Sequence, residues 1–151
     1  MLKGDFEMKI VLLESLGIHD NLLASYVKPL REKGYEFAAY ERSDNLDVQI
    51  EEAKDADILI IANMPLKAEV INACPKLKYI DVAFTGVDHV ALDAARAKGI
   101  KVSNASGYST VAVAELTIAM ILGLLRYVPQ IDKACRTGGT KAGFIGSELA
   151  G

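Results

Sequence analysis

The sequence predicts an α/β fold of three layers, in which helices cover both faces of a doubly wound, parallel, five-stranded sheet. Five short apolar runs alternate with segments whose apolar residues recur at helical spacing. The runs at 9–13 and 57–61 are almost wholly apolar, as expected for strands buried on both faces of a parallel sheet. Such alternation implies right-handed crossovers. Because the first run is more apolar than the second, we expect the flavodoxin-like strand order 2-1-3-4-5.

Breaker residues set the bounds of the elements. Asn63-Met64-Pro65 ends the third strand, and Gly34 closes the first helix as a carboxyl-terminal cap. Pro29 lies inside that helix and is expected to kink it or shift its frame. The segment at 35–40 alternates more than the other strands and suits a sheet edge. The expected strands are 9–13, 35–40, 57–61, 78–82 and 100–103, and the expected helices are 20–33, 47–54, 67–73, 88–98 and 110–136.

The last of these helices differs from the others. Between residues 111 and 125 it is apolar on nearly every side, so one sheet face cannot cover it. The apolar stretch is short for a membrane span and carries Glu115 and Thr117, which favours a buried or interface helix. Pro129 is expected to kink or interrupt the helix, and Gly138-Gly139 to end it.

Composition excludes several classes of function. The chain has 151 residues, of which 51% are hydrophobic and 25% charged, as in an ordinary globular domain. A net charge of −3 without a Lys/Arg cluster argues against nucleic-acid binding. The two cysteines, which we expect to be reduced, lie far apart without metal-ligand spacing, and two histidines are too few partners for a zinc site, so no metal site is expected. Residues 1–7 have no apolar core and are not expected to act as a signal peptide. We therefore expect a cytoplasmic protein that binds neither nucleic acid nor membrane.

One turn stands out as a candidate binding site. Thr85-Gly86-Val87 follows an apolar strand and precedes the helical pattern at 88–98, so its N–H groups and the helix dipole would suit a carboxylate or phosphate. The alternative is that Gly86 serves packing alone. His89 is interpreted as an exposed residue of the first helical turn rather than a catalyst. Glu115 is either a functional acid or a first-turn carboxylate favoured by the helix dipole.

Other ligand motifs do not fit. Gly143, Gly146 and Gly151 lack the spacing of G-x-G-x-x-G and follow no strand. Glu14 stands where a flavodoxin would hold its flavin phosphate, and Asp57 lies at the wrong end of its strand for a phosphoacceptor. No His–carboxylate or nucleophile–base pair can be argued from spacing, so no catalytic residue is assigned.

Three blocks of sequence resemble the D-isomer-specific 2-hydroxyacid dehydrogenases, a family that includes phosphoglycerate, glycerate and D-lactate dehydrogenases. The blocks are FTGVD at 84–88, GIKVSNASGYST at 99–110 and VAE at 113–115. The likeness extends over essentially the whole chain from Met8. The tail GSELAG at 146–151 is similar to the segment that precedes the family's dinucleotide-binding glycine motif.

The resemblance implies roles for particular residues. The turn Thr85-Gly86-Val87 would hold the substrate carboxylate through backbone N–H groups, Asn63-Met64 would face the substrate, and Thr110 would lie near the NAD cofactor. The family's catalytic Arg, Glu and His and its glycine motif lie beyond Gly151. The resemblance thus implies a truncated, catalytically incomplete half of an enzyme, to which NAD is not expected to bind.

This likeness also implies a division of the chain and a set of partners. The parts are a leader (1–7), a flavodoxin-like substrate-binding domain (8–109), an interdomain or interface helix (110–137) and a linker toward a dinucleotide-binding domain (138–151). The expected partners are a small 2-hydroxy or 2-oxo acid, bound weakly, and a second copy of the chain, docked through the helix at 111–125. The alternative is a stand-alone flavodoxin-like binding or interaction domain without hydride transfer.

Overall fold

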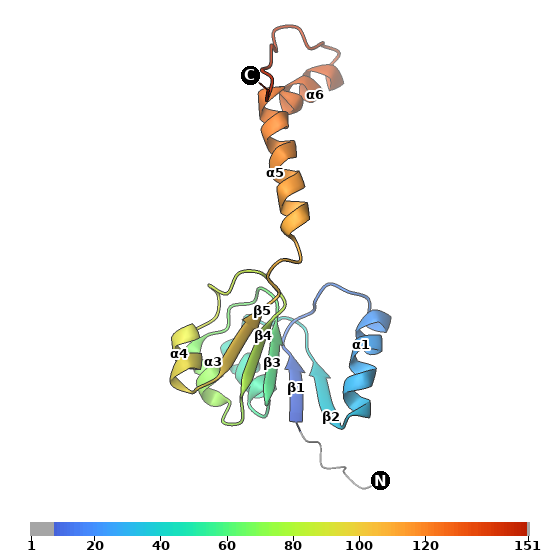
Figure 1. The fold of residues 1–151 in the computed structure, drawn as a ribbon. Coiled ribbons are helices and arrows are strands. Elements are labelled where there is room, and N and C mark those ends of the chain that lie inside the picture. Colours follow the sequence, from blue (N-terminus) through green and yellow to red (C-terminus); the bar gives the residue numbers. More distant parts are fainter. Residues whose placement is uncertain (1–7, 151) are drawn as a thin grey trace. The chain divides into compact units, whose positions relative to one another are not determined.

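The computed structural model describes residues 8–150, which divide between Ser106 and Gly107 into two compact units. The first unit holds a five-stranded sheet and four helices, and the second holds two helices and the tail (Figure 1). The elements are β1 (Met8–Leu12), α1 (Asp20–Glu32), β2 (Tyr35–Ala39), α2 (Leu46–Ala53), β3 (Ile58–Ile61), α3 (Ala68–Ala73), β4 (Tyr79–Val82), α4 (Leu92–Ala97), β5 (Lys101–Asn104), α5 (Thr110–Leu125) and α6 (Val128–Arg136).

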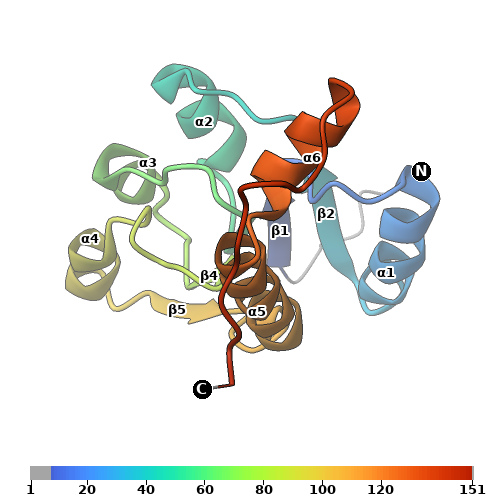
Figure 2. The ribbon, with the colours of Figure 1, turned by 90° about the horizontal axis from the view of Figure 1, so that it is seen from above.

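The sheet confirms the predicted class and strand order. All five strands are parallel and lie in the order β2-β1-β3-β4-β5, so β2 is an edge strand as its alternating sequence indicated. Helix α1 lies on one face of the sheet, and α2, α3 and α4 lie on the other (Figure 2). This arrangement follows from right-handed crossovers that first move outward from β1 and then return past it.

The main hydrophobic core lies between one face of the sheet and the helices that cover it, α2, α3 and α4. Alternate residues of β3 and β4 are fully buried there against Val70 and Ile71 of α3. The residues between them, which point to the α1 face, are only partly buried, so β3 and β4 are fully buried on one face only. The expectation of burial on both faces is confirmed for β1, in which the consecutive residues 10–12 are all buried. The fully buried strand residues are Leu59, Ile61, Ile80 and Val82.

Helix α1 ends where the sequence predicted, and Pro29 does not end it. The helix continues through Pro29 to Glu32, and Gly34 follows with a φ of 87°, the left-handed conformation that glycine adopts without a steric penalty.

One further contact connects the ends of α3 and α4. The Lys98 ammonium donates hydrogen bonds to the carbonyl oxygens of Ile71 (2.9 Å) and Cys74 (2.9 Å), at the end of α3.

The helix expected at 88–98 is shorter than its sequence pattern. It begins only at Leu92, because residues 88–91 pair with a distant segment instead. Leu66 donates its N–H to the carbonyl of His89 at 2.9 Å, and Ala91 donates to the carbonyl of Leu66 at 2.9 Å. The prediction was wrong here because this long-range bridge takes up backbone groups that a first helical turn would otherwise order.

The helix expected at 110–136 is two helices. Helices α5 and α6 meet at Tyr127, whose φ of 54° is left-handed, and their axes differ by 63°. Pro129 explains the position of the break, since proline fits the first turn of a helix but not its interior. Among residues 8–150, no single helix has both the length and the apolar composition of a membrane span; α5 and α6 reach those limits only when counted together.

The second unit closes the end of α5 with the tail of the chain. Ser147 donates its N–H to the carbonyl of Leu125 at 3.0 Å, and the rings of Tyr127 and Phe144 have centroids 6.0 Å apart. Gly146 lies close to the end of α5, where a Cβ at position 146 would be only 2.5 Å from the carbonyl oxygen of Leu125. The tail can therefore approach the helix end only because residue 146 has no side chain.

Candidate functional site

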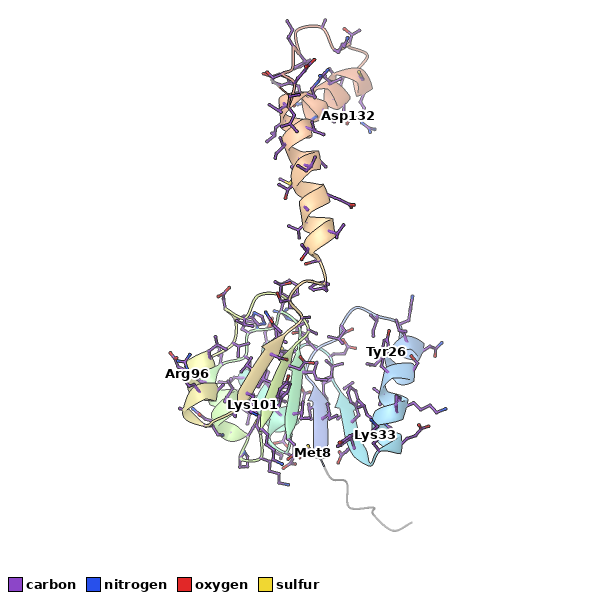
Figure 3. The ribbon with its side chains drawn as sticks, in the orientation of Figure 1. Met8, Tyr26, Lys33, Arg96, Lys101 and Asp132 are labelled. Carbon is purple, nitrogen blue, oxygen red and sulfur yellow. The ribbon has the colours of Figure 1, made fainter. Side chains whose placement is uncertain are left out.

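The candidate site lies at the carboxyl-terminal edge of the sheet, where open α/β sheets bind their ligands. Met8 and Lys101, labelled in Figure 3, mark the opposite, amino-terminal edge. The loops that follow β3 and β4 leave the carboxyl-terminal edge next to each other, since the last residues of these strands, Ile61 and Val82, are partners in the sheet. Asn63 and Thr85 stand on these two loops, a few residues beyond that pair.

The loop after β4 is held by the end of β5. Asn104 donates through Nδ2 to the carbonyl of Thr85 at 2.6 Å, and Ala105 donates its N–H to the carbonyls of Val82 and Phe84, each at 3.0 Å. These bonds use carbonyl oxygens in and beside the loop as acceptors, and they hold its backbone in place. They do not use the N–H groups of Thr85, Gly86 and Val87.

The N–H groups of the turn itself are free. Within residues 8–150, no acceptor forms a hydrogen bond with the backbone N–H of Thr85, Gly86 or Val87. Thr85 is exposed, and Gly86 and Val87 are partly exposed. A Cβ added to Gly86 would meet only Oδ2 of Asp88, at 3.8 Å, and the φ of Gly86 is not left-handed, so neither packing nor backbone strain within the unit requires glycine there. Free backbone donors on adjacent residues are the groups that bind anions in backbone concavities, so the predicted role of this turn stays a prediction that the free N–H groups support.

The helix-dipole part of the prediction was wrong. Helix α4 begins at Leu92, five residues after Val87, and has only six residues. The positive end of its dipole therefore does not act on Thr85-Gly86-Val87, because the dipole effect fades within one turn of the helix end. The affinity of the turn for an anion depends on its own N–H groups.

The loop after β3 is held by a carboxylate that sequence reasoning did not assign to the site. Glu14 is only 4% exposed, and its Oε1 accepts hydrogen bonds from the N–H groups of Ala62 and Met64, each at 2.7 Å. The Met64 side chain is fully buried. Met64 thus has neither an exposed side chain nor a free N–H in this unit. Asn63, which is exposed, is the residue of this loop that can reach a ligand.

Arg42 connects Glu14 and Asn63, so that these three side chains form a cluster. Its Nη1 donates to Oδ1 of Asn63 at 3.1 Å and lies 3.9 Å from Oε2 of Glu14, while its Nε lies 3.4 Å from Oδ1 of Asp44. The only hint of this cluster in the sequence is a glutamate directly after an apolar strand. Its partners come from two other loops, so spacing along the chain could not have found them.

Three further residues were singled out in the sequence. Two of them, His89 and Glu115, lie in surroundings other than those expected. His89 lies before α4 rather than in its first turn and is partly buried, and its Nε2 has no hydrogen-bond partner among the described residues. Glu115 is exposed beyond the first turn of α5, so the interpretation as a first-turn carboxylate was wrong. Thr110 is the first residue of α5 and belongs to the second unit, and its role near a cofactor stays a prediction.

The described residues offer little for metals or dinucleotides. Residues 8–150 contain no group of three His, Cys, Asp or Glu side chains placed to hold a metal ion. They also contain no glycine-rich turn between a strand and a helix of the kind that holds a pyrophosphate.

Comparison with known proteins gives one consistent result. Residues 12–147 match the sequence profile of the D-isomer specific 2-hydroxyacid dehydrogenase catalytic domain. Human D-3-phosphoglycerate dehydrogenase is 40% identical over 104 residues, which make up 68% of this chain and 20% of that protein. The chain spans between a fifth and about two-fifths of the length of such curated relatives.

Solved structures show the same relationship. An acyclic imino acid reductase in complex with NADPH and D-Arg matches with a TM-score of 0.80 and 26% identity, over 94% of this chain and 46% of that one. The NAD-dependent formate dehydrogenase of Staphylococcus aureus in complex with NAD matches with a TM-score of 0.73 and 30% identity, over 87% and 43% of the two chains.

Proposed function

Because this chain belongs to the D-isomer specific 2-hydroxyacid dehydrogenase family, we propose that it supplies the substrate-binding half of an NAD-dependent oxidoreductase. The substrate would be a small 2-hydroxy acid or the corresponding 2-oxo acid, bound by its carboxylate at Thr85-Gly86-Val87. The observation that carries the proposal is the set of three adjacent N–H groups without an acceptor among the described residues.

Binding at this turn would use backbone donors that are already held in place. Hydrogen bonds from N–H groups to an ionised carboxylate are stronger than bonds between neutral groups. The bonds from Asn104 and Ala105 fix the loop before the ligand arrives, which lowers the entropic cost of binding. The turn is open to water in this unit, so we expect an affinity on the order of millimolar.

Asn63 would provide the second contact. Its loop lies beside the turn, and its side chain is exposed. Met64 belonged to the predicted contact as well, but its side chain is buried and its N–H is bonded to Glu14, so we propose Asn63 alone from this loop as a donor to the ligand. Thr110 stays the proposed residue nearest to the cofactor.

The cofactor would supply or accept the hydride when a dinucleotide-binding domain is present. NAD is the proposed form because family relatives bind it. We propose that the 151 residues bind the organic acid but do not carry out hydride transfer alone, which is supported by the lack of a glycine-rich strand-to-helix turn among residues 8–150. The residues described here would bind and orient the acid.

Titration with D-lactate, the simplest chiral 2-hydroxy acid, tests the carboxylate site. We expect the backbone amide resonances of Thr85, Gly86 and Val87 in a ¹⁵N-labelled sample to shift with a common dissociation constant. Shifts spread evenly over the surface, or shifts that spare these three residues, would contradict the proposed function and favour a stand-alone binding domain.

A second copy of the chain is the proposed macromolecular partner. No residue of α5 is buried, and its large apolar side chains are exposed from Val111 to Leu124. An exposed apolar surface of this extent is typical of an interface. We propose a homodimer that covers residues 111–125.

The two free cysteines, Cys74 and Cys135, support a reducing, cytoplasmic compartment.

A further inference from the structure

Asn63 is held in one orientation by Arg42. Nη1 of Arg42 lies 3.1 Å from Oδ1 of Asn63. A guanidinium carries only donors, so chemistry requires the oxygen of the amide, not its nitrogen, to face Arg42. The Nδ2 group of Asn63, with two hydrogens to donate, therefore points elsewhere. It has no acceptor among the described residues.

Glu14 fixes the backbone on both sides of Asn63. Its buried Oε1 accepts from Ala62 and from Met64, the residues that flank Asn63 in the chain. Its second oxygen, Oε2, lies 3.9 Å from Nη1 of Arg42. One carboxylate thus holds both the loop that carries Asn63 and the guanidinium that orients its amide.

Arg42 is poorly suited to bind an anion itself. Its charge is matched by Glu14 and Asp44, whose carboxylate oxygens lie 3.9 Å and 3.4 Å from guanidinium nitrogens. The guanidinium can therefore act on a ligand through Asn63 rather than directly.

We propose that Arg42 is a positioning residue, which turns the Nδ2 group of Asn63 toward the ligand as a hydrogen-bond donor for the oxygen on C2 of the bound acid. This inference rests on the proposed function, since it takes the carboxylate to be bound at Thr85-Gly86-Val87. The loops of Asn63 and Thr85 leave paired strands side by side, as the Ile61–Val82 pair requires. Both a 2-hydroxyl and a 2-oxo group accept a hydrogen bond, whereas an unsubstituted carboxylic acid has no oxygen at C2.

The test compares D-lactate with propionate, which has the same carbon chain but no hydroxyl group. In the unchanged chain, both acids should shift the backbone amide of Gly86, and only D-lactate should shift the side-chain NH₂ resonances of Asn63. D-Lactate should bind about 3- to 10-fold more tightly than propionate, the gain expected from one additional hydrogen bond.

Arg42→Met should remove that preference. The variant keeps the length of an unbranched side chain but cannot donate to Asn63. We expect its affinity for D-lactate to fall to that for propionate, the affinity for propionate to stay within about 2-fold, and the response of the Asn63 side chain to D-lactate to disappear. Arg42→Lys, which can still donate to Oδ1, should restore part of the preference.

Arg96→Met is the matched control. Arg96 projects from α4 (Figure 3) and pairs with Asp93 at 2.9 Å, so the change also removes one exposed ion pair of the first unit. It should leave the preference for D-lactate intact.

The possible outcomes separate the two proposals. If D-lactate shifts neither Gly86 nor Asn63 in the unchanged chain, the proposed function and this inference both fail. If Gly86 responds but the Asn63 side chain does not, the inference is overturned and the proposed function stands. The same holds if Arg42→Met keeps the ratio of the two affinities, or if Arg96→Met lowers that ratio equally.

Discussion

Nζ of Lys78 lies 2.9 Å from Oδ1 of Asp57, and this ion pair joins the chain before β3 to the chain before β4. Oδ2 of the same carboxylate accepts the backbone N–H of Lys9, in β1, at 3.0 Å. Burial alone would raise the pKa of Asp57, but the hydrogen bonds from Lys78 and Lys9 outweigh it and hold that pKa below its ordinary value. The carboxylate therefore stabilises the fold in its ionised form.

Asp57→Asn should lower the free energy of unfolding by about 1–3 kcal/mol at pH 7, the usual cost of losing a buried, hydrogen-bonded charge. Because the pKa of Asp57 is lower in the folded than in the unfolded chain, its contribution is complete above the unfolded pKa of about 3.9 and is lost as the pH falls through the folded value. Urea unfolding of both forms at several pH values measures this. A difference that is constant down to pH 2 would contradict the assignment.

The two cysteines should react at very different rates. Cys74 is fully buried, its Sγ lies 3.1 Å from the carbonyl oxygen of Val70, and burial raises the pKa of its thiol to about 11. Cys135 is exposed. Since the thiolate is the reactive form, a thiol-exchange reagent at pH 8 should label one thiol rapidly in the folded chain and two in urea. Cys135→Ser should abolish the rapid phase, and a rapid phase that survives this change would show that Cys74 is accessible.

Gly86→Ala should separate binding from stability. The added methyl group has room in this unit, so the free energy of unfolding should change by less than about 1 kcal/mol. We expect the same methyl group, which is attached beside the N–H groups of Gly86 and Val87, to hinder the approach of a ligand to them, so the affinity for D-lactate should fall by at least about 10-fold. Titration and urea unfolding of the same sample measure both effects. Unchanged affinity would mean that the carboxylate binds elsewhere.

Gly146→Ala provides the opposite case. Its Cβ would clash with the carbonyl oxygen of Leu125, so the tail must move away from the end of α5. We expect the amide of Ser147 to lose its protection from hydrogen exchange, with no effect on the affinity for D-lactate.

The chain should not turn over 2-oxo acids by itself. Within residues 8–150, neither His19 nor His89 forms a hydrogen-bonded pair with a carboxylate, and no glycine-rich turn is available to a dinucleotide. Oxidation of NADH or NADPH with pyruvate should match the rate without protein. A turnover within a factor of about a hundred of the ~10 per second typical of enzymes would overturn this expectation.

Self-association should depend on α5. Light scattering at concentrations on the order of 100 µM should give a mass above the 16.3 kDa of one chain. Leu116, which is 60% exposed, lies in the middle of the apolar surface, and Leu116→Glu should restore the monomer mass. Ile145→Glu, at an exposed apolar position outside α5, is the control. A monomer in the unchanged chain, without binding of a dye for apolar surfaces, would refute the proposed interface.

Much of the fold was predictable because its main signal is local. Apolar runs between breakers located all five strands to within one residue at each end. Their alternation with helices predicted the parallel sheet, and the greater apolarity of the first run predicted the order 2-1-3-4-5. The start of α4 was missed because residues 88–91 look helical in isolation but bond to Leu66. The break before α6 was placed only approximately, since the sequence showed Pro129 but not the left-handed Tyr127.

The site divides in the same way. Thr85-Gly86-Val87 was predicted from its position after a strand and from a family resemblance and stays a prediction, whereas one of the reasons given for it, a helix dipole, does not apply. The contacts among Glu14, Arg42 and Asn63 join three loops, and only the folded sheet brings those loops together. Residue types alone could not distinguish these three from ordinary surface charges and amides.

Two carboxylates are mostly buried among residues 8–106, and they lie at opposite ends of the strands. At the amino-terminal edge, Asp57 accepts hydrogen bonds from Lys9 and Lys78. At the carboxyl-terminal edge, where the ligand would bind, Glu14 accepts hydrogen bonds from the loop after β3. For protein engineering this means that the two edges can be randomised in separate libraries. Variants selected for heat resistance around Asp57 can be combined with variants selected for a new acid around Asn63, because substitutions that share no contacts usually have additive effects.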